Sequence, residues 1–212
     1  MLQLLKPYLL LSSLFLFSGC HISKYKHLSC DKIVLSESHI SPILKGKTAL
    51  KYNASIDILN NHLTGLLVVK QTDSISKHIV FVTELGMKMF DFEVKGNEIN
   101  VVYVFEPLNK PKLINVLKQN FSDMLLLTPY GYNDSKCENQ NHIVYISSRD
   151  KTKRCFTISK SNELILQETF RKNKRISKIN YTYNAASQTF SQIKCKQYGL
   201  IKFYFELNEP TP

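Results

Sequence analysis

The sequence lacks the motifs on which several large enzyme classes depend. It has no G-x-S-x-G turn, no glycine-rich phosphate loop and no H-E-x-x-H pair, which excludes the serine-hydrolase elbow, the phosphate-binding loop and the zinc-protease helix. Asp91 and Glu93 share one strand face, but solvent-facing positions explain them better than a catalytic pair. We therefore expect no enzyme, no metal site and no cofactor. The histidines are scattered, at His21, His27, His39, His62, His78 and His142.

Internal repeats and low-complexity segments are absent as well, and glycine and proline are few, with seven residues of each. These absences exclude a repeat architecture. About 190 residues follow the N-terminal segment described next, which is enough for one domain with a proper core. We expect a tether over residues 20–36, one domain over residues 37–207 and a tail over residues 208–212.

The N-terminus carries an export pattern. Lys6 supplies a short positive region, and the apolar run after it is too short to span a bilayer. Ser18 and Gly19 then precede Cys20, as in the lipobox of bacterial lipoproteins, whose cysteine carries a diacylglycerol. We expect residues 1–19 to be a lipoprotein signal peptide and Cys20 to be lipidated. The alternative is an ordinary signal peptide that happens to contain a cysteine.

The residue that follows Cys20 indicates in which membrane the protein is expected to lie. His21 stands where aspartate is the usual signal for retention in the inner membrane, so the outer membrane of a Gram-negative bacterium is favoured. Several acyl chains on Cys20 would make the attachment lasting. We expect the body of the protein to lie in the periplasm.

Four further cysteines would then be in an oxidising compartment. An even number permits two disulfides, with three connectivities that the sequence cannot separate. Buried free thiols are an equal alternative. The four are Cys30, Cys137, Cys155 and Cys195.

Acidic residues are scarce relative to basic ones, 17 against 28, and the formal net charge is +11. One interpretation is a solvated, self-repelling surface, and another is attraction to anionic headgroups or an acidic partner. Nucleic-acid binding is implausible for an exported, lipid-anchored protein. The densest run, at residues 171–175, falls between two strand-like segments, where a hairpin tip explains it.

Period-two alternation of apolar and polar residues dominates the chain and predicts eleven antiparallel strands. Between the fifth and sixth, residues 109–127 repeat apolar residues at three- and four-residue steps, which predicts one amphipathic helix. Residues 128–141 are expected to be loop. The predicted strands are 50–58, 63–71, 78–83, 88–94, 98–105, 142–147, 154–159, 163–170, 176–183, 190–198 and 200–207.

This pattern predicts a mainly β fold, an antiparallel, strongly curved and incomplete β-barrel covered by one or more α-helices that enclose an apolar cavity. A filled core without a cavity requires the same alternation and remains an alternative. One turn is unusual, because Glu84-Leu85-Gly86 joins two strands with a leucine where Asn, Asp or Ser is common.

The order of these elements resembles the LolB family of outer-membrane lipoproteins. A lipobox, a polar tether and a meander are followed by an x-Leu-Gly turn, a strand pair, a helix and C-terminal hairpins, over about Lys51 to Leu207. The family pattern at the turn is Pro-Leu-Gly, and here Glu84 replaces the proline. The chain also has no tryptophan, of which LolB proteins typically have several, and its cysteines are additional.

The resemblance implies an outer-membrane acceptor that receives lipoproteins from a LolA-like periplasmic carrier and inserts them in the membrane. Their acyl chains would move by relative affinity, with no cofactor. Leu85 would be a membrane-inserting finger at a tip that includes Gly86 and Met87. The alternative is that Leu85 folds back as core.

The acyl-chain cavity implied by the resemblance would be lined by inward-facing apolar residues of the sheet and the helix. These are Tyr52, Ile56, Phe81, Phe90, Phe92, Tyr103 and Phe105 from the strands and Leu113, Leu117 and Phe121 from the helix. Two other functions remain open, a lipoprotein that binds another lipid and a structural subunit of an envelope complex.

Overall fold

The computed structural model describes residues 25, 28–36, 39–40, 43–44, 46–73, 75–96, 98–126 and 133–210. The predicted signal peptide, Cys20 and residues 21–24, 26 and 27 of the predicted tether lie outside these residues. Within the described ranges, no helix is both long enough and apolar enough to cross a membrane.

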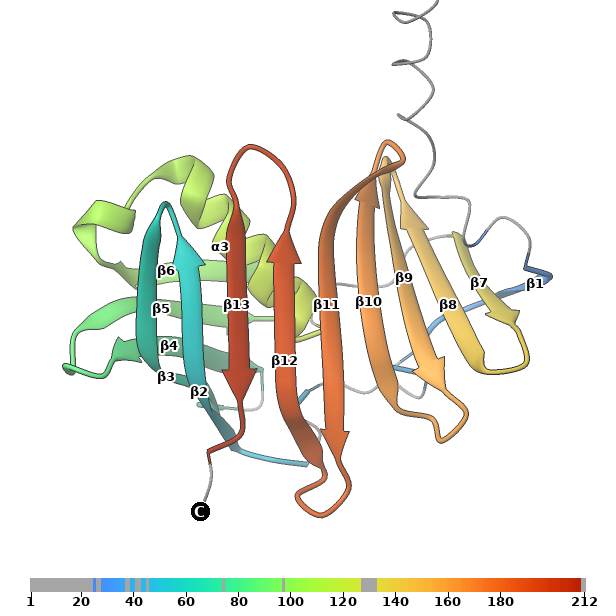
Figure 1. The fold of residues 1–212 in the computed structure, drawn as a ribbon, viewed down its shortest axis with the longest axis horizontal. Helices are drawn as coiled ribbons and strands as arrows, with labels where there is room; N and C mark the ends of the chain where they lie inside the picture. Colours follow the sequence, from blue (N-terminus) through green and yellow to red (C-terminus); the bar gives the residue numbers. More distant parts are fainter. Residues whose placement is uncertain are drawn as a thin grey trace, which may run out of the picture.

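The described residues form one antiparallel, curved and unclosed sheet of thirteen strands (Figure 1). All eleven predicted strands are present, and two more were not predicted. The strands are β1 (Cys30–Ile33), β2 (Ala49–Ile58), β3 (Asn61–Gln71), β4 (Ser76–Thr83), β5 (Lys88–Lys95), β6 (Glu98–Val104), β7 (Asn133–Glu138), β8 (His142–Arg149), β9 (Thr152–Ser159), β10 (Leu164–Arg171), β11 (Lys174–Asn184), β12 (Thr189–Gln197) and β13 (Phe203–Asn208).

The two additional strands correct the sequence analysis. β7 lies within the predicted loop, and β1 lies within residues that were expected to be tether. Neither "NDSKCE" nor "CDKI" shows a clear apolar alternation, so periodicity could not detect them. They pair with each other, Cys30 opposite Cys137, and a disulfide joins these two cysteines. Cys155 and Cys195 are buried thiols, so the described structure has one disulfide.

The strand order places the turns on two rims. It runs β1-β7-β8-β9-β10-β11-β12-β13-β2-β3-β4-β5-β6, with the last strand, β13, paired to β2 in the middle of the sheet. Because neighbouring strands are antiparallel, alternate turns lie on the same side of the sheet. We call one side the hairpin rim. It contains the turns at residues 59–60, 150–151, 172–173 and 198–202, and the 84–87 turn continues the same edge where β4 and β5 bend away toward the left of Figure 1.

One helix, α3 (Pro111–Met124), covers one face of the sheet behind β12 and β13 (Figure 1). A 3-10 turn, η2 (Glu106–Leu108), leads into it, and Pro111 occupies its first turn, where the missing N–H costs nothing. The ring of Phe121 lies 5.2 Å from that of Phe90 and 5.7 Å from that of Phe205. The main core therefore lies between α3 and the sheet.

A second, smaller core lies on the other face of the sheet. Thr169 of β10 donates a hydrogen bond to α3, whereas its neighbour Phe170 packs in a separate apolar cluster. Tyr25 is buried in this cluster and donates a hydrogen bond of 2.6 Å to Glu168. The chain just before β1 is therefore packed against the sheet at Tyr25.

Candidate functional site

The turn between β4 and β5 presents Leu85 to solvent. Its side chain is 93% exposed, and Met87 beside it is 47% exposed. The alternative that Leu85 folds back as core is therefore wrong. Gly86 has a φ of +80°, a conformation that favours glycine, and its N–H donates to the Thr83 carbonyl at 2.9 Å.

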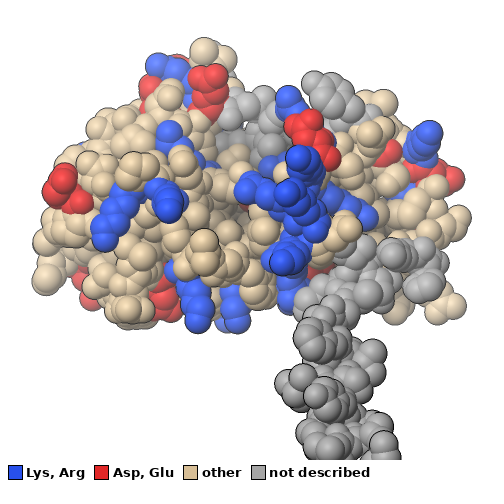
Figure 2. Space-filling model, turned by 90° about the horizontal axis from the view of Figure 1, so that it is seen from above, with Lys and Arg blue, Asp and Glu red and all other residues tan. Residues whose placement is uncertain are grey.

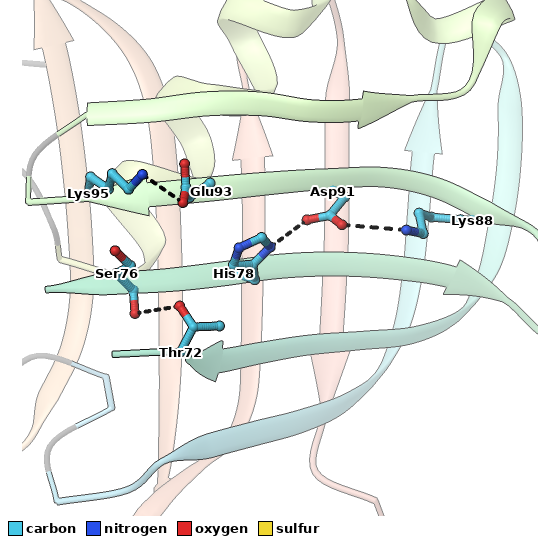
Figure 3. Close-up of polar contacts among 7 residues, drawn as sticks. All are labelled: Thr72, Ser76, His78, Lys88, Asp91, Glu93 and Lys95. Carbon is cyan, nitrogen blue, oxygen red and sulfur yellow. Dashed lines mark hydrogen bonds and ion pairs between the residues drawn. The ribbon is translucent and has the colours of Figure 1, made fainter. Parts of the chain in front are cut away.

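Polar contacts brace the outer face of the β4–β5 hairpin (Figure 3). Asp91 of β5 lies 2.9 Å from Nδ1 of His78 on β4 and 3.5 Å from Nζ of Lys88. Glu93 pairs with Lys95 at 3.0 Å. Asp91 and Glu93 thus have partners in structural ion pairs, and the hairpin that carries Leu85 is held across its width. The expectation that both face solvent is wrong for Asp91, which is only 8% exposed beside these partners.

The turn is also tied to β3. The N–H of Glu84 donates to the Thr64 carbonyl at 3.2 Å. Next along β3, a Cβ on Gly65 would lie only 2.0 Å from the Val82 carbonyl oxygen, so this close approach of β3 and β4 requires glycine. A surface hollow of about 630 Å³ opens here, with Thr64, Gly65 and Glu84 in its wall.

The structure brings most of the predicted cavity residues together. Eight of the ten are fully buried in the main core, and Phe105 is partly buried against it. The eight are Tyr52, Ile56, Phe81, Phe90, Phe92, Leu113, Leu117 and Phe121.

Tyr103 is the exception, and the prediction that it faces inward is wrong. A β-bulge between Asp91 and Phe92 shifts the register, so that Tyr103 lies opposite Asp91 and Val101 lies opposite Phe92. The extra residue reverses the alternation, since side chains change face at every position. Tyr103 is consequently 41% exposed, and Nζ of Lys88 lies 5.8 Å from the centre of its ring.

Among the described residues, the part of the interior around Phe121 is filled by aromatic side chains. The Phe121 ring packs against four other rings, those of Phe90, Phe92, Phe203 and Phe205. Three hollows of about 580–670 Å³ lie elsewhere on the described surface, and none of the ten predicted residues lines them.

The C-terminal half of α3 is held by buried polar contacts that the sequence analysis missed. Asp123 accepts hydrogen bonds from Arg154 Nε at 3.0 Å and from Thr169 Oγ1 at 3.2 Å. Burial raises the pKa of Asp123, and the Arg154 guanidinium opposes the rise. Cys195 Sγ donates to Asn120 Oδ1 at 3.2 Å. One signal for these contacts was present in the sequence, namely that two polar residues, Asn120 and Asp123, lie next to the apolar stripe of the helix.

In the N-terminal half of α3, Leu113 and Leu117 are buried in the main apolar core. The two halves of the helix are thus held differently.

Among the residues that the structure describes, no group of three or more His, Cys, Asp or Glu could hold a metal ion.

The fold has solved counterparts. The structure of a LolA superfamily protein, NE2245 from Nitrosomonas europaea, matches with a TM-score of 0.50 at 10% sequence identity, over 84% of this chain and 93% of that chain. A DUF1329 family protein from Desulfovibrio piger matches with a TM-score of 0.42 at 9% identity, over 82% and 87% of the two chains. No protein-family model and no curated protein matches the sequence. The fold is therefore of the LolA/LolB type, which the first of these structures supports.

Proposed function

We propose that this chain binds the acyl chains of lipoproteins between α3 and the sheet and delivers them to a membrane. In the finer form of the proposal, Cys20 anchors it in the outer membrane, its body lies in the periplasm, and its cargo comes from a LolA-like carrier. The resemblance to LolB and the shared fold support this proposal. The observation that carries it is Leu85, which stands exposed at the tip of a braced hairpin.

The free energy gained by burying one leucine side chain limits what the tip can do. Burying a leucine side chain in an apolar phase contributes roughly 1.5–3 kcal/mol. This is too little to anchor a protein, which is the role of Cys20, but it is enough to bias which side of the protein meets the bilayer. Met87 adds a second, flexible apolar side chain to the same tip.

Uptake of cargo requires space beside α3, where the rings around Phe121 are closely packed. The N-terminal half of α3 is the part that moves, because Leu113 and Leu117 pack in the apolar core and an acyl chain can replace their apolar contacts. The C-terminal half stays in place through Asp123 and Asn120, whose hydrogen bonds to Arg154, Thr169 and Cys195 have no apolar substitute. Cargo would therefore enter beside Leu113 and Leu117.

The test is a transfer assay with the chain carrying Cys20→Ala, so that it has no acyl anchor of its own. The protein is mixed with a carrier loaded with an acylated lipoprotein, and liposomes are added afterwards. We expect the cargo to move to this protein and then to the liposomes. Leu85→Glu should accept cargo normally and fail to release it, because the apolar tip is lost while the interior is unchanged.

The matched control is Ile75→Glu, which places the same charge at an exposed apolar position on the opposite rim. It should behave like the unmodified chain in both steps. Cargo that stays on the carrier at every concentration would reject the acceptor role and direct attention to other lipids. Equal loss of release by both variants would reject the role of Leu85.

A further inference from the structure

The positive charge of the protein is concentrated on the hairpin rim. Six exposed basic side chains lie at or beside its turns, and none of them forms an ion pair with another described residue. Figure 2, which looks down on Figure 1 from above, shows a dense group of Lys and Arg near the middle of this face. The six are Lys151, Arg171, Lys172, Lys174, Lys196 and Lys202.

Charges on the opposite side of the sheet are largely balanced. There Glu138 pairs with Lys160 at 2.7 Å and with Lys136 at 3.4 Å, and Lys95 pairs with Glu93. The two neighbouring lysines hold the pKa of Glu138 below its ordinary value. Lys51, Lys70 and Lys77 near the opposite rim form no ion pair among the described residues either, but they lie on three different strands, whereas the six basic residues of the hairpin rim are grouped at its turns.

Isolated apolar side chains project among these cations. Leu200, in the loop between β12 and β13, is 106% exposed, and Leu59 in the neighbouring β2–β3 turn is also exposed. The loop is fixed at its base, because the Tyr198 N–H donates to the Ile176 carbonyl at 2.8 Å and the Arg175 guanidinium lies 4.8 Å from the Tyr198 ring. Leu200 is thus presented by an anchored loop.

A hollow of about 670 Å³ lies between this loop and the β2–β3 turn. Lys196, Lys202, Leu59 and Leu200 all contribute to its wall. The acidic residue in its lining is Asp57, and Oδ1 of Asp57 lies 2.6 Å from Nδ1 of His62. The hollow therefore has two lysines and two leucines in its wall, a combination that suits a phosphate attached to acyl chains.

We propose that the hairpin rim docks on a bilayer that contains anionic phospholipids. The lysines and arginines lie at the depth of the phosphates, and Leu200 enters the boundary between headgroups and acyl chains. Single apolar tips separated by cations fit this surface better than an acidic protein, whose interface would bury a continuous patch. The proposal stands independently of lipoprotein transfer.

The experiment measures binding of the full chain carrying Cys20→Ala to vesicles of phosphatidylcholine, with or without added phosphatidylglycerol. A triple variant, Lys151→Gln, Lys174→Gln and Lys202→Gln, removes three charges from the hairpin rim. Its matched control removes three charges near the opposite rim, by Lys51→Gln, Lys70→Gln and Lys77→Gln. Both lower the net charge equally, so only the position of the charges differs.

We expect tight binding only to the vesicles that contain phosphatidylglycerol. The rim variant should bind them about 100-fold more weakly, on the basis of roughly 1 kcal/mol for each cation near an anionic surface. The control variant should lose much less affinity for the same vesicles. Leu200→Ser should weaken binding to the same vesicles by about tenfold, the equivalent of roughly 1.4 kcal/mol, with an unchanged dependence on salt.

Three results would overturn the proposal. The first is equal binding to both kinds of vesicle, and the second is equal loss in the rim variant and its control. The third is a rim variant that binds vesicles normally but no longer binds an acidic carrier protein, which would make the rim a protein-docking surface. Failure of cargo transfer with normal vesicle binding would reject the proposed function and leave this inference standing.

Discussion

Replacing Phe121 with alanine tests whether the interior beneath α3 is both the core of the fold and a site for acyl chains. Phe121 is fully buried, and four aromatic rings surround it with centroid distances of 5.2–6.5 Å. The surrounding rings cannot readily close the cavity that the substitution leaves. The free energy of unfolding should therefore fall by an amount in the upper part of the usual range of about 3–5 kcal/mol. For a chain of this size the Tm would fall by roughly 6–20 °C.

The assay is urea unfolding of the oxidised protein, followed by far-ultraviolet circular dichroism because the chain contains no tryptophan. The measurement is then repeated with a monomeric lysophospholipid. If its acyl chain fills the new space, the variant should regain about 2.7 kcal/mol at a lipid concentration 100 times Kd. The unmodified protein should gain less, because its own ring occupies that space.

Phe170→Ala is the matched control. It removes the same side chain from an equally buried position, but in the small core on the other face of the sheet. It should lose comparable stability and regain none of it with lipid. A loss below about 1 kcal/mol for Phe121→Ala would refute the packing argument. Equal rescue of both variants would refute the interior as the lipid site.

Three further predictions concern the frame of the fold. Gly65→Ala should lower the urea midpoint more than Gly96→Ala, because the new Cβ meets the Val82 carbonyl oxygen at 2.0 Å, whereas at Gly96 nothing lies within 4 Å and only the φ of +56° opposes the substitution. Equal effects would argue against the close approach. Replacing both Cys30 and Cys137 with serine should cost about 2–5 kcal/mol, since their disulfide closes a loop with a sequence separation of 107, and unchanged unfolding would contradict it. Lys160 and Lys136 lower the pKa of Glu138, so this pairing stabilises the fold at neutral pH and is lost as the pH falls through the lowered pKa. Lys160→Gln should raise that pKa toward its ordinary value in an NMR titration, and no change would exclude the pairing.

The candidate site was partly visible in the sequence. A leucine in a tight turn between two alternating runs is a local anomaly, and its exposure follows because a two-stranded tip has no core to enter. The interior side chains followed from alternation, which holds as long as register is regular. Tyr103 was assigned to the wrong face because one extra residue in β6 changes which side chains point inward, and no local signal in the sequence marks a bulge.

The hydrophobic periods of the sequence alone determined the eleven long strands, the single helix after the fifth of them and the antiparallel class of the sheet, because these features depend on residues close together in the chain. Only the tertiary structure decided the pairing of Cys30 with Cys137, the contact of Asp123 with Arg154 and the gathering of cations on one rim. Each of these joins residues that are distant in sequence, and the strand order, with β13 beside β2, determines which of them meet. The hydrophobic pattern along the chain indicates which consecutive strands form hairpins, but it does not indicate which strands distant in sequence lie side by side in the sheet.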